Sequence, residues 1–279
     1  MDFRLTDIPN KTDLPTTIAS LSALYALTGL VGGESYKATD TKHVHEYLGG
    51  GESTPANWLD HSAKGTGGTW NTKSWDAYGD SITAQAYWIT PVVSNLGLSL
   101  TNLGVGGSQA GGSDTKAMWK DANIATISAT SDLITVMAGT NDWANNRPLG
   151  GITSVDTEDY CGGLNVIITK LHTQNSTGRV VFFTPPYGEY IDYASRAGSW
   201  ANGYENDLGL STFDYGEAMI NVCRSRGIPC VDMGNAGING MNKAIYIKND
   251  GAYLHPNSAG GDRLAEVVNG FLLSISPLI

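Results

Sequence analysis

Basic residues are scarce in this chain. Lys and Arg number 17 against 27 Asp and Glu, which gives a formal net charge of −10. Nucleic acids and anionic membranes attract basic surfaces, so this acidic balance argues against both as partners. No apolar run is long enough to span a bilayer. The sequence therefore predicts a protein with no nucleic-acid partner and no membrane span.

Cysteine is also rare, with three residues in the chain, which is a poor basis for a disulfide framework. Cys223 and Cys230 are near enough in sequence to pair, but free buried thiols are the expected state. A secretory signal is not expected, because acidic residues precede the apolar stretch Ile18–Val31 where a basic start is required. Either the chain is not exported by this route or a signal has been removed.

Glycine, in contrast, is abundant, and its 35 residues indicate many turns. From Ser74 onward, short apolar segments alternate with stretches of helical periodicity. The predicted strands are Trp75–Tyr78, Leu98–Leu103, Leu133–Ala138, Val180–Thr184 and Pro229–Met233. Apolar strands of this kind are typical of a parallel sheet covered on both faces. Residues 70–279 are therefore predicted to form a three-layer α/β/α domain with a five-stranded, doubly wound parallel sheet.

Residues 1–69 do not follow this pattern and are expected to form an N-terminal appendage that ends in a glycine-rich linker. Apolar residues between Leu14 and Tyr25 have the a/d rhythm of a coiled coil for less than two heptads. One amphipathic helix packed on the main domain is the alternative, while a coiled coil predicts a homotrimer. Alternating residues in Tyr36–Tyr47 predict a small β-hairpin.

Polar residues follow or flank the ends of four predicted strands, and parallel sheets bind ligands at this edge. Acyl transfer needs an activated nucleophile, a base and oxyanion donors. Ser81 supplies a hydroxyl, although helix N-cap is its alternative role. His255 is the candidate base, and Asp250 is the candidate residue to orient it. The candidate oxyanion donors are the Ser81 N–H, the Gly107 N–H and the Asn141 side-chain amide.

Four ordered motifs carry a resemblance to a known family. They are Gly79-Asp80-Ser81, Asn102-x-Gly104-x-x-Gly107, Gly139-x-Asn141-Asp142 and His255-Pro256-Asn257. In this order they resemble the conserved blocks of the SGNH hydrolases, also called GDSL esterases. The resemblance implies a flavodoxin-like fold and a serine esterase that needs neither a metal nor an organic cofactor. It also implies that Ser81 is the nucleophile, that Gly107 and Asn141 complete the oxyanion hole, and that His255 is the base.

The sequence departs from the family where the acid is expected. The family's acid sits three residues before the histidine, and Ala252 occupies that position. Asp250, five residues before, is the nearest carboxylate. The alternatives are a backbone carbonyl or another acid such as Asp262. A non-catalytic glycan-binding module therefore stays open beside the esterase.

The resemblance further implies a substrate that is an acylated small molecule or polysaccharide. Aromatic residues suited to a sugar ring or an acyl chain form the expected binding rim: Trp143, Tyr187, Tyr190 and Trp200. An acetyl ester on carbohydrate is the expected substrate, with a lipase or thioesterase as the alternative. Tyr36–Tyr47 followed by Trp58 resembles short repeats of bacteriophage tail proteins, which predicts a virion-associated or extracellular location.

Overall fold

The computed structural model describes residues 70–186, 205–249 and 254–275 in full. In the N-terminal part it describes the backbone of four short strands at 17–18, 35–38, 43–47 and 58–60. Residue contacts divide the chain into two units, 1–66 and 67–279. The appendage and catalytic domain that the sequence places at 1–69 and 70–279 stay a prediction.

The N-terminal unit contains a four-stranded sheet of order β1-β2-β3-β4. Its strands are β1 (Thr17–Ile18), β2 (Ser35–Ala38), β3 (His43–Tyr47) and β4 (Trp58–Asp60). β2 and β3 are antiparallel neighbours within the stretch where the sequence predicts a hairpin. Thr17 and Ile18 lie in a strand although the sequence predicts a helix there, because two adjacent β-branched residues favour extended backbone. The rest of Leu14–Tyr25 lies outside the described residues, and the homotrimer stays a prediction.

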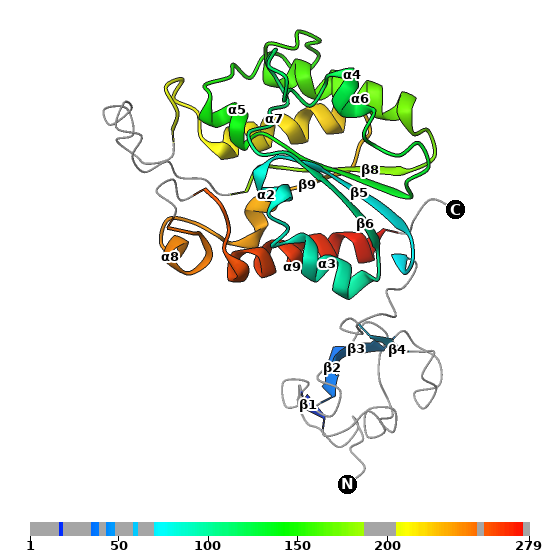
Figure 1. Ribbon diagram of the computed structural model, residues 1–279. Coiled ribbons are helices and arrows are strands. Elements are labelled where there is room, and N and C mark those ends of the chain that lie inside the picture. The colour runs from blue at the N-terminus through cyan, green and yellow to red at the C-terminus, as the bar shows by residue number, and fades with distance from the viewer. Residues whose placement is uncertain are drawn as a thin grey trace. The chain divides into compact units, whose positions relative to one another are not determined.

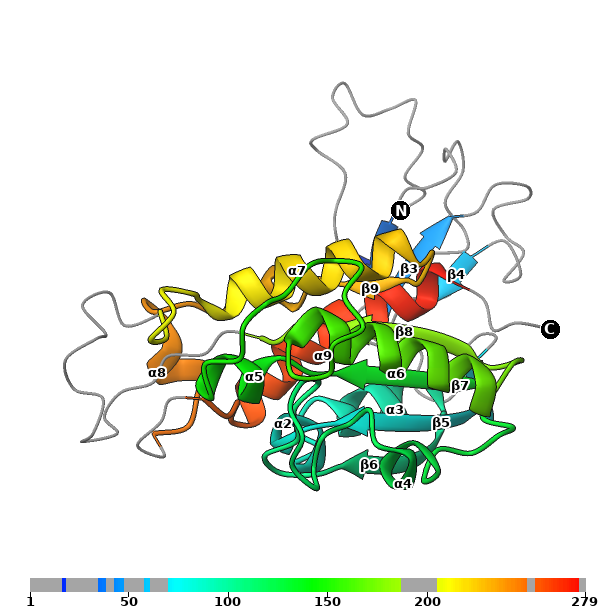
Figure 2. The same cartoon turned by 90° about the horizontal axis from the view of Figure 1, so that it is seen from above.

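The second unit is built on a five-stranded sheet in which every neighbouring pair of strands is parallel. The order β6-β5-β7-β8-β9 is that of a flavodoxin-like sheet, as predicted. The strands are β5 (Ser74–Gly79), β6 (Ser99–Gly104), β7 (Leu133–Met137), β8 (Arg179–Phe183) and β9 (Cys230–Val231). Figure 1 shows the sheet between two layers of helices, and Figure 2 shows the same domain from above.

Helices cover both faces of the sheet, with α3 and α9 on one side and α4, α6 and α7 on the other (Figure 1). The helices are α2 (Ser81–Ala84), α3 (Ile89–Leu96), α4 (Asp121–Ile124), α5 (Thr140–Ala144), α6 (Tyr160–Gln174), α7 (Thr212–Ser225), η5 (Met233–Ala236), α8 (Lys243–Tyr246) and α9 (Ser258–Ser274). No helix in the described part of the chain is long and apolar enough to cross a membrane.

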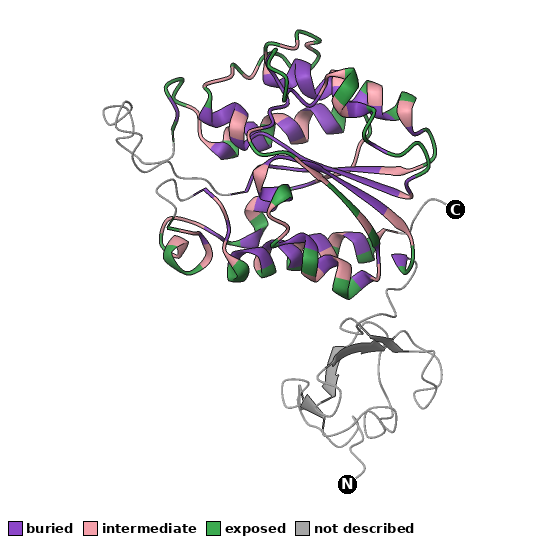
Figure 3. Cartoon of the chain, in the orientation of Figure 1, coloured by how far each residue is buried: buried purple, intermediate pink, exposed green. Residues whose placement is uncertain are grey.

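The core consists of two apolar clusters, one on each face of the sheet. The inner strands β5, β7 and β8 are largely buried, whereas the edge strand β6 is partly exposed (Figure 3). Alternate residues of β7 divide between them: Leu133 packs with α3 and α9, whereas Ile134 packs with α6 and α7. This period of two arises because successive side chains of a strand point to opposite faces. Burial on both faces fixes the register of the sheet.

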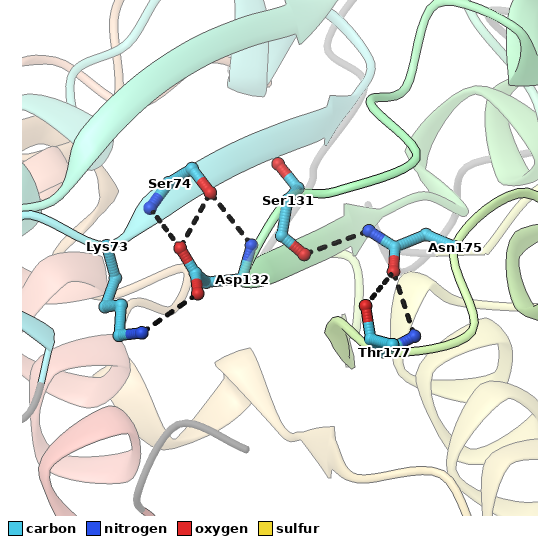
Figure 4. A network of polar contacts seen from close by, with 6 residues as sticks. All are labelled: Lys73, Ser74, Ser131, Asp132, Asn175 and Thr177. Atoms are coloured by element: carbon cyan, nitrogen blue, oxygen red, sulfur yellow. Dashed lines mark hydrogen bonds and ion pairs between the residues drawn. The ribbon is translucent and has the colours of Figure 1, made fainter. Parts of the chain in front are cut away.

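Polar contacts tie the amino-terminal ends of two strands together (Figure 4). The Asp132 carboxylate before β7 accepts hydrogen bonds from the Ser74 N–H and Oγ, both at 2.8 Å, and from Lys73 Nζ at 3.1 Å. The Ser74 N–H is the main reason that the pKa of Asp132 lies below its usual value. Nearby, Asn175 Nδ2 donates to the Ser131 carbonyl at 2.9 Å. These contacts lie at the amino edge of the sheet, opposite the carboxyl edge where parallel sheets bind ligands.

Candidate active site

The chain leaves β5 through a tight turn that places Ser81 at the carboxyl edge of the sheet. A Cβ on Gly79 would lie 2.2 Å from Thr83 Oγ1, so only glycine fits there. Asp80 is the N-cap of α2, and its Oδ1 accepts a hydrogen bond from the Ile82 N–H at 2.9 Å. The capping role that the sequence leaves open for Ser81 therefore belongs to Asp80. This arrangement leaves the Ser81 hydroxyl available for another partner.

That partner is His255, whose Nε2 lies 2.9 Å from Ser81 Oγ although the residues are 174 positions apart. Backbone pairing on both sides of the histidine holds it there. The Lys248 N–H donates to the His255 carbonyl at 2.8 Å, and the Asn257 N–H donates to the Tyr246 carbonyl at 2.9 Å. A hydroxyl in contact with an imidazole is the arrangement that activates a serine nucleophile.

The loop after β6 passes beside Ser81 as a β-turn over residues 105–108. The Ser108 N–H donates to the Val105 carbonyl at 3.1 Å. Gly107, the third residue of the turn, has a φ of +83°. A positive φ at this position, but not at Gly106, defines a type II turn and favours glycine. A Cβ on Gly106 would lie 3.9 Å from the Ser81 Cβ, so the turn borders the hydroxyl-bearing side chain.

The third motif reaches the same loop from β7. Gly139 has a φ of +114° and is the N-cap residue of α5, and Asn141 lies in the first turn of that helix. Asn141 Nδ2 donates to the Ser108 carbonyl at 3.0 Å. An amide carries two N–H donors, so this bond leaves one donor for a ligand. The structure thus brings Ser81, Gly107, Asn141 and His255 to one edge of the sheet.

Two fully buried carboxyl groups, those of Asp80 and Asp142, adjoin Ser81 and Asn141 in the sequence. Asp142 accepts hydrogen bonds from the Ala110 N–H at 2.9 Å and the Gly111 N–H at 2.7 Å, which ties α5 to the loop after β6. Burial raises the pKa of Asp142 to about 6, while the two N–H groups act in the opposite direction. Burial, reinforced by the charge of Asp142, raises the pKa of Asp80 to about 7. Both residues belong to the sequence motifs that carry the family resemblance.

Other predicted residues have different outcomes. Trp143 is fully buried, and its Nε1–H donates to the Leu210 carbonyl at 3.0 Å. It therefore packs in the core beside α7 and offers no face to a substrate, which corrects its assignment to the binding rim. The remaining predicted site residues lie outside the described residues: Tyr187, Tyr190, Trp200 and Asp250. The three cysteines, Cys161, Cys223 and Cys230, are free thiols.

The strand order and the two helical layers define a three-layer α/β protein of the flavodoxin-like class. The model of the GDSL-like Lipase/Acylhydrolase family matches residues 60–263, so the chain belongs to this family of ester-cleaving enzymes. This membership agrees with the resemblance that the four motifs carry.

Solved structures show the same fold. A protein from Lactobacillus plantarum is 29% identical, with a TM-score of 0.61 over 73% of this chain and 98% of that chain. A possible lipase from Chitinophaga pinensis is 20% identical, with a TM-score of 0.56 over 72% and 98%. An aryl esterase from M. smegmatis is 17% identical, with a TM-score of 0.51 over 75% and 100%. A comparison with curated proteins finds no match.

Proposed function

We propose that this protein is a serine esterase in which Ser81 is the nucleophile and His255 is the general base. The observation that carries the proposal is the distance of 2.9 Å between Ser81 Oγ and His255 Nε2 at the carboxyl edge of the sheet. The buried carboxyl groups Asp80 and Asp142 contact backbone N–H groups, so their role is to hold the loops. The hydroxyl and the imidazole remain for the chemistry.

The reaction proceeds in two steps through an acyl-enzyme. Ser81 Oγ attacks the ester carbonyl while His255 takes the hydroxyl proton, and the developing oxyanion receives hydrogen bonds from the Ser81 N–H, the Gly107 N–H and Asn141 Nδ2. His255 then returns the proton to the leaving alcohol. In the second step the same imidazole takes a proton from the water that attacks the acyl-enzyme, and it returns this proton to Ser81 Oγ as the acid leaves.

We assign Asp250 as the residue that orients His255. The support is the pairing of the chain around the histidine, because the Lys248 N–H lies 2.8 Å from the His255 carbonyl. Asp250 is two residues from Lys248 in the sequence, and two residues of fully extended chain span at most about 7 Å, so this separation allows its carboxylate to reach the histidine. Asp250→Asn is expected to lower kcat by about 100-fold or more, because the imidazole loses the carboxylate that selects its tautomer. Asp262→Asn is the matched control, and a larger loss in that variant would contradict the assignment.

We further propose that the substrate is a short acyl ester, an acetyl group above all, on a carbohydrate. The support comes from the sequence, in which aromatic residues suited to sugar rings follow β8: Tyr187, Tyr190 and Trp200. The alternatives are a longer acyl chain, which defines a lipase or thioesterase, and glycan binding without turnover. Neither has a specific contact in the described residues that favours it.

Hydrolysis of p-nitrophenyl acetate, butyrate and octanoate by wild type and Ser81→Ala tests this assignment. Fastest cleavage of acetate and an inactive variant support it, and release of acetate from an acetylated polysaccharide extends it to carbohydrate. Preference for octanoate contradicts the acetyl assignment and favours a lipase. Equal inactivity of both proteins on the esters and on the polysaccharide contradicts the enzyme and favours a binding module.

A further inference from the structure

The turn beside Ser81 can offer the Gly107 N–H to an oxyanion only in one orientation of the Gly106–Gly107 peptide group. The Gly106 carbonyl and the Gly107 N–H belong to the same trans peptide, so they point in opposite directions. In the type II turn over 105–108 this is the central peptide, and rotation by half a turn converts type II into type I. Such a rotation exchanges the donor facing one side of the loop for an acceptor.

Glycine at both central positions makes this rotation easy. Gly106 and Gly107 carry no Cβ, so neither type II nor type I is excluded by side-chain clashes. The turn ends are fixed, since the Val105 N–H donates to the Gly79 carbonyl at 2.9 Å and the Ser108 N–H closes the turn. These bonds do not involve the central peptide. Something else must set its orientation.

Lys116 makes that contact. Its Nζ donates to the Gly106 carbonyl at 2.8 Å, and a Cβ on Gly107 would lie 3.4 Å from the same Nζ. A Cβ on Gly106 would instead face Ser81. The turn thus lies between Ser81 and Lys116, with the carbonyl directed to the lysine. The Gly107 N–H is directed away from the lysine, toward the side that bears Ser81.

The loop that carries Lys116 is itself held in place. Asp114 Oδ1 accepts the Lys116 N–H at 2.7 Å, and Asp114 Oδ2 accepts Gln109 Nε2 at 3.0 Å. The Met118 N–H donates to the Gln109 carbonyl at 2.8 Å. The loop therefore returns to the turn and delivers the ammonium group to Gly106. Hydrogen bonds from a charged donor are stronger than those from a neutral one.

We propose that Lys116 is a positioning residue of the oxyanion hole. It holds the Gly106–Gly107 peptide in the type II orientation, and its positive charge polarises the peptide so that the Gly107 N–H is a stronger donor. The inference rests on the proposed function, because it requires Gly107 to bind the oxyanion. Without Lys116 the turn also populates type I, in which the Gly106 carbonyl faces the developing negative charge.

The test compares the kinetics of Lys116→Met, Lys116→Arg and Lys120→Met on p-nitrophenyl acetate. Lys116→Met is expected to lower kcat about tenfold with KM changed less than about twofold, because the lost contact acts in the transition state. Lys116→Arg restores most of kcat, since a hollow of about 320 Å³ lined by Lys116 leaves room for the guanidinium. Lys120→Met is the matched control: it removes a lysine that lies 5.7 Å from the Trp119 ring. Its kcat is expected to stay at the wild-type value.

Binding of an arylboronic acid gives a second readout that does not depend on turnover. The tetrahedral serine adduct places a boronate oxygen in the oxyanion hole, so Lys116→Met is expected to weaken binding by a factor similar to its loss in kcat. Wild-type kcat and boronate affinity in Lys116→Met overturn the inference, as does a loss that Arg fails to restore. If Ser81→Ala is inactive while Lys116→Met keeps the wild-type kcat and boronate affinity, the inference about Lys116 is overturned and the proposed function stands. If Ser81→Ala keeps full activity, the proposed function is overturned. A wild-type chain that neither cleaves the ester nor binds the boronate overturns both.

Discussion

The buried carboxyl of Asp80 makes the stability of this fold depend on pH in an unusual direction. Its side chain is fully buried, one oxygen accepts from the Ile82 N–H, and the charge of Asp142 lies nearby. Burial raises its pKa from 3.8 in the unfolded chain to about 7. Between these values the folded state binds the proton and the unfolded state does not. The free energy of unfolding contributed by this group therefore falls as the pH rises from about 4 to about 7.

The shift of about three pKa units corresponds to about 4 kcal/mol at most. Asp80→Asn removes this dependence and retains the cap, because Asn is isosteric with Asp and is an equally good N-cap residue. The variant is expected to resemble wild type in stability near pH 3.5 and to exceed it by up to about 4 kcal/mol near pH 8. The growth of this difference with pH is the quantity to measure.

Urea denaturation followed by tryptophan fluorescence at a series of pH values measures both proteins. Glu217→Gln, which removes an exposed carboxylate on α7, is the matched control and is expected to follow the wild-type curve. A difference between Asp80→Asn and wild type that is constant across the pH range would refute the reasoning. A variant less stable than wild type near pH 8 would refute it as well.

Two further perturbations test the amino-terminal edge of the sheet and the packing of α2. Asp132→Asn loses acceptor capacity for Ser74 and Lys73 and is expected to lower the free energy of unfolding by about 1 to 2 kcal/mol at neutral pH. The pKa of Asp132 is lowered in the folded state, so the stability that this carboxylate contributes is lost as the pH falls below about 4. Denaturation curves of wild type and Asp132→Asn at neutral pH and in acid must therefore show that the difference in free energy of unfolding shrinks in acid. Gly104→Ala places a Cβ 2.3 Å from the Ala84 N atom and is expected to cost about 1 to 3 kcal/mol of stability and to reduce esterase activity, because α2 carries the nucleophile. Gly270→Ala on α9 has open space around it and is expected to be neutral or stabilising in the same denaturation assay, so an equal loss there would contradict the steric argument.

Much of the sheet follows from short apolar runs in the sequence. The predicted strand Leu133–Ala138 is observed as Leu133–Met137, because side chains of both alternating sets are buried. The prediction is poorest at Pro229–Met233, where the strand is only Cys230–Val231. Asp232 ends it by accepting the Gly234 N–H at 2.9 Å and capping η5. A local cap of this kind competes with strand pairing, and apolar periodicity does not reveal it.

The contact between Ser81 and His255 could be predicted from the chemistry of the two side chains and from the order of the motifs in the sequence. Ser81 and His255 are distant in sequence, yet parallel strands bring their ends to one edge, and the structure places them in contact. Trp143 shows the limit: its position after β7 was predicted, but the direction of its side chain depends on burial in the core and on a hydrogen bond to the Leu210 carbonyl. Lys116 was not identified, because an exposed lysine in a loop looks like any other until the fold returns it to Gly106.

Covalent labelling tests the central claim most directly, because it asks whether Ser81 is an activated nucleophile without requiring knowledge of the substrate. Wild type, Ser81→Ala and His255→Ala are treated with a fluorophosphonate, and the modified peptide is identified by mass spectrometry. We expect rapid modification of wild type at Ser81, none at that position in Ser81→Ala, and strongly slowed modification in His255→Ala. Modification of another residue in wild type, or an equal rate in His255→Ala, would contradict it.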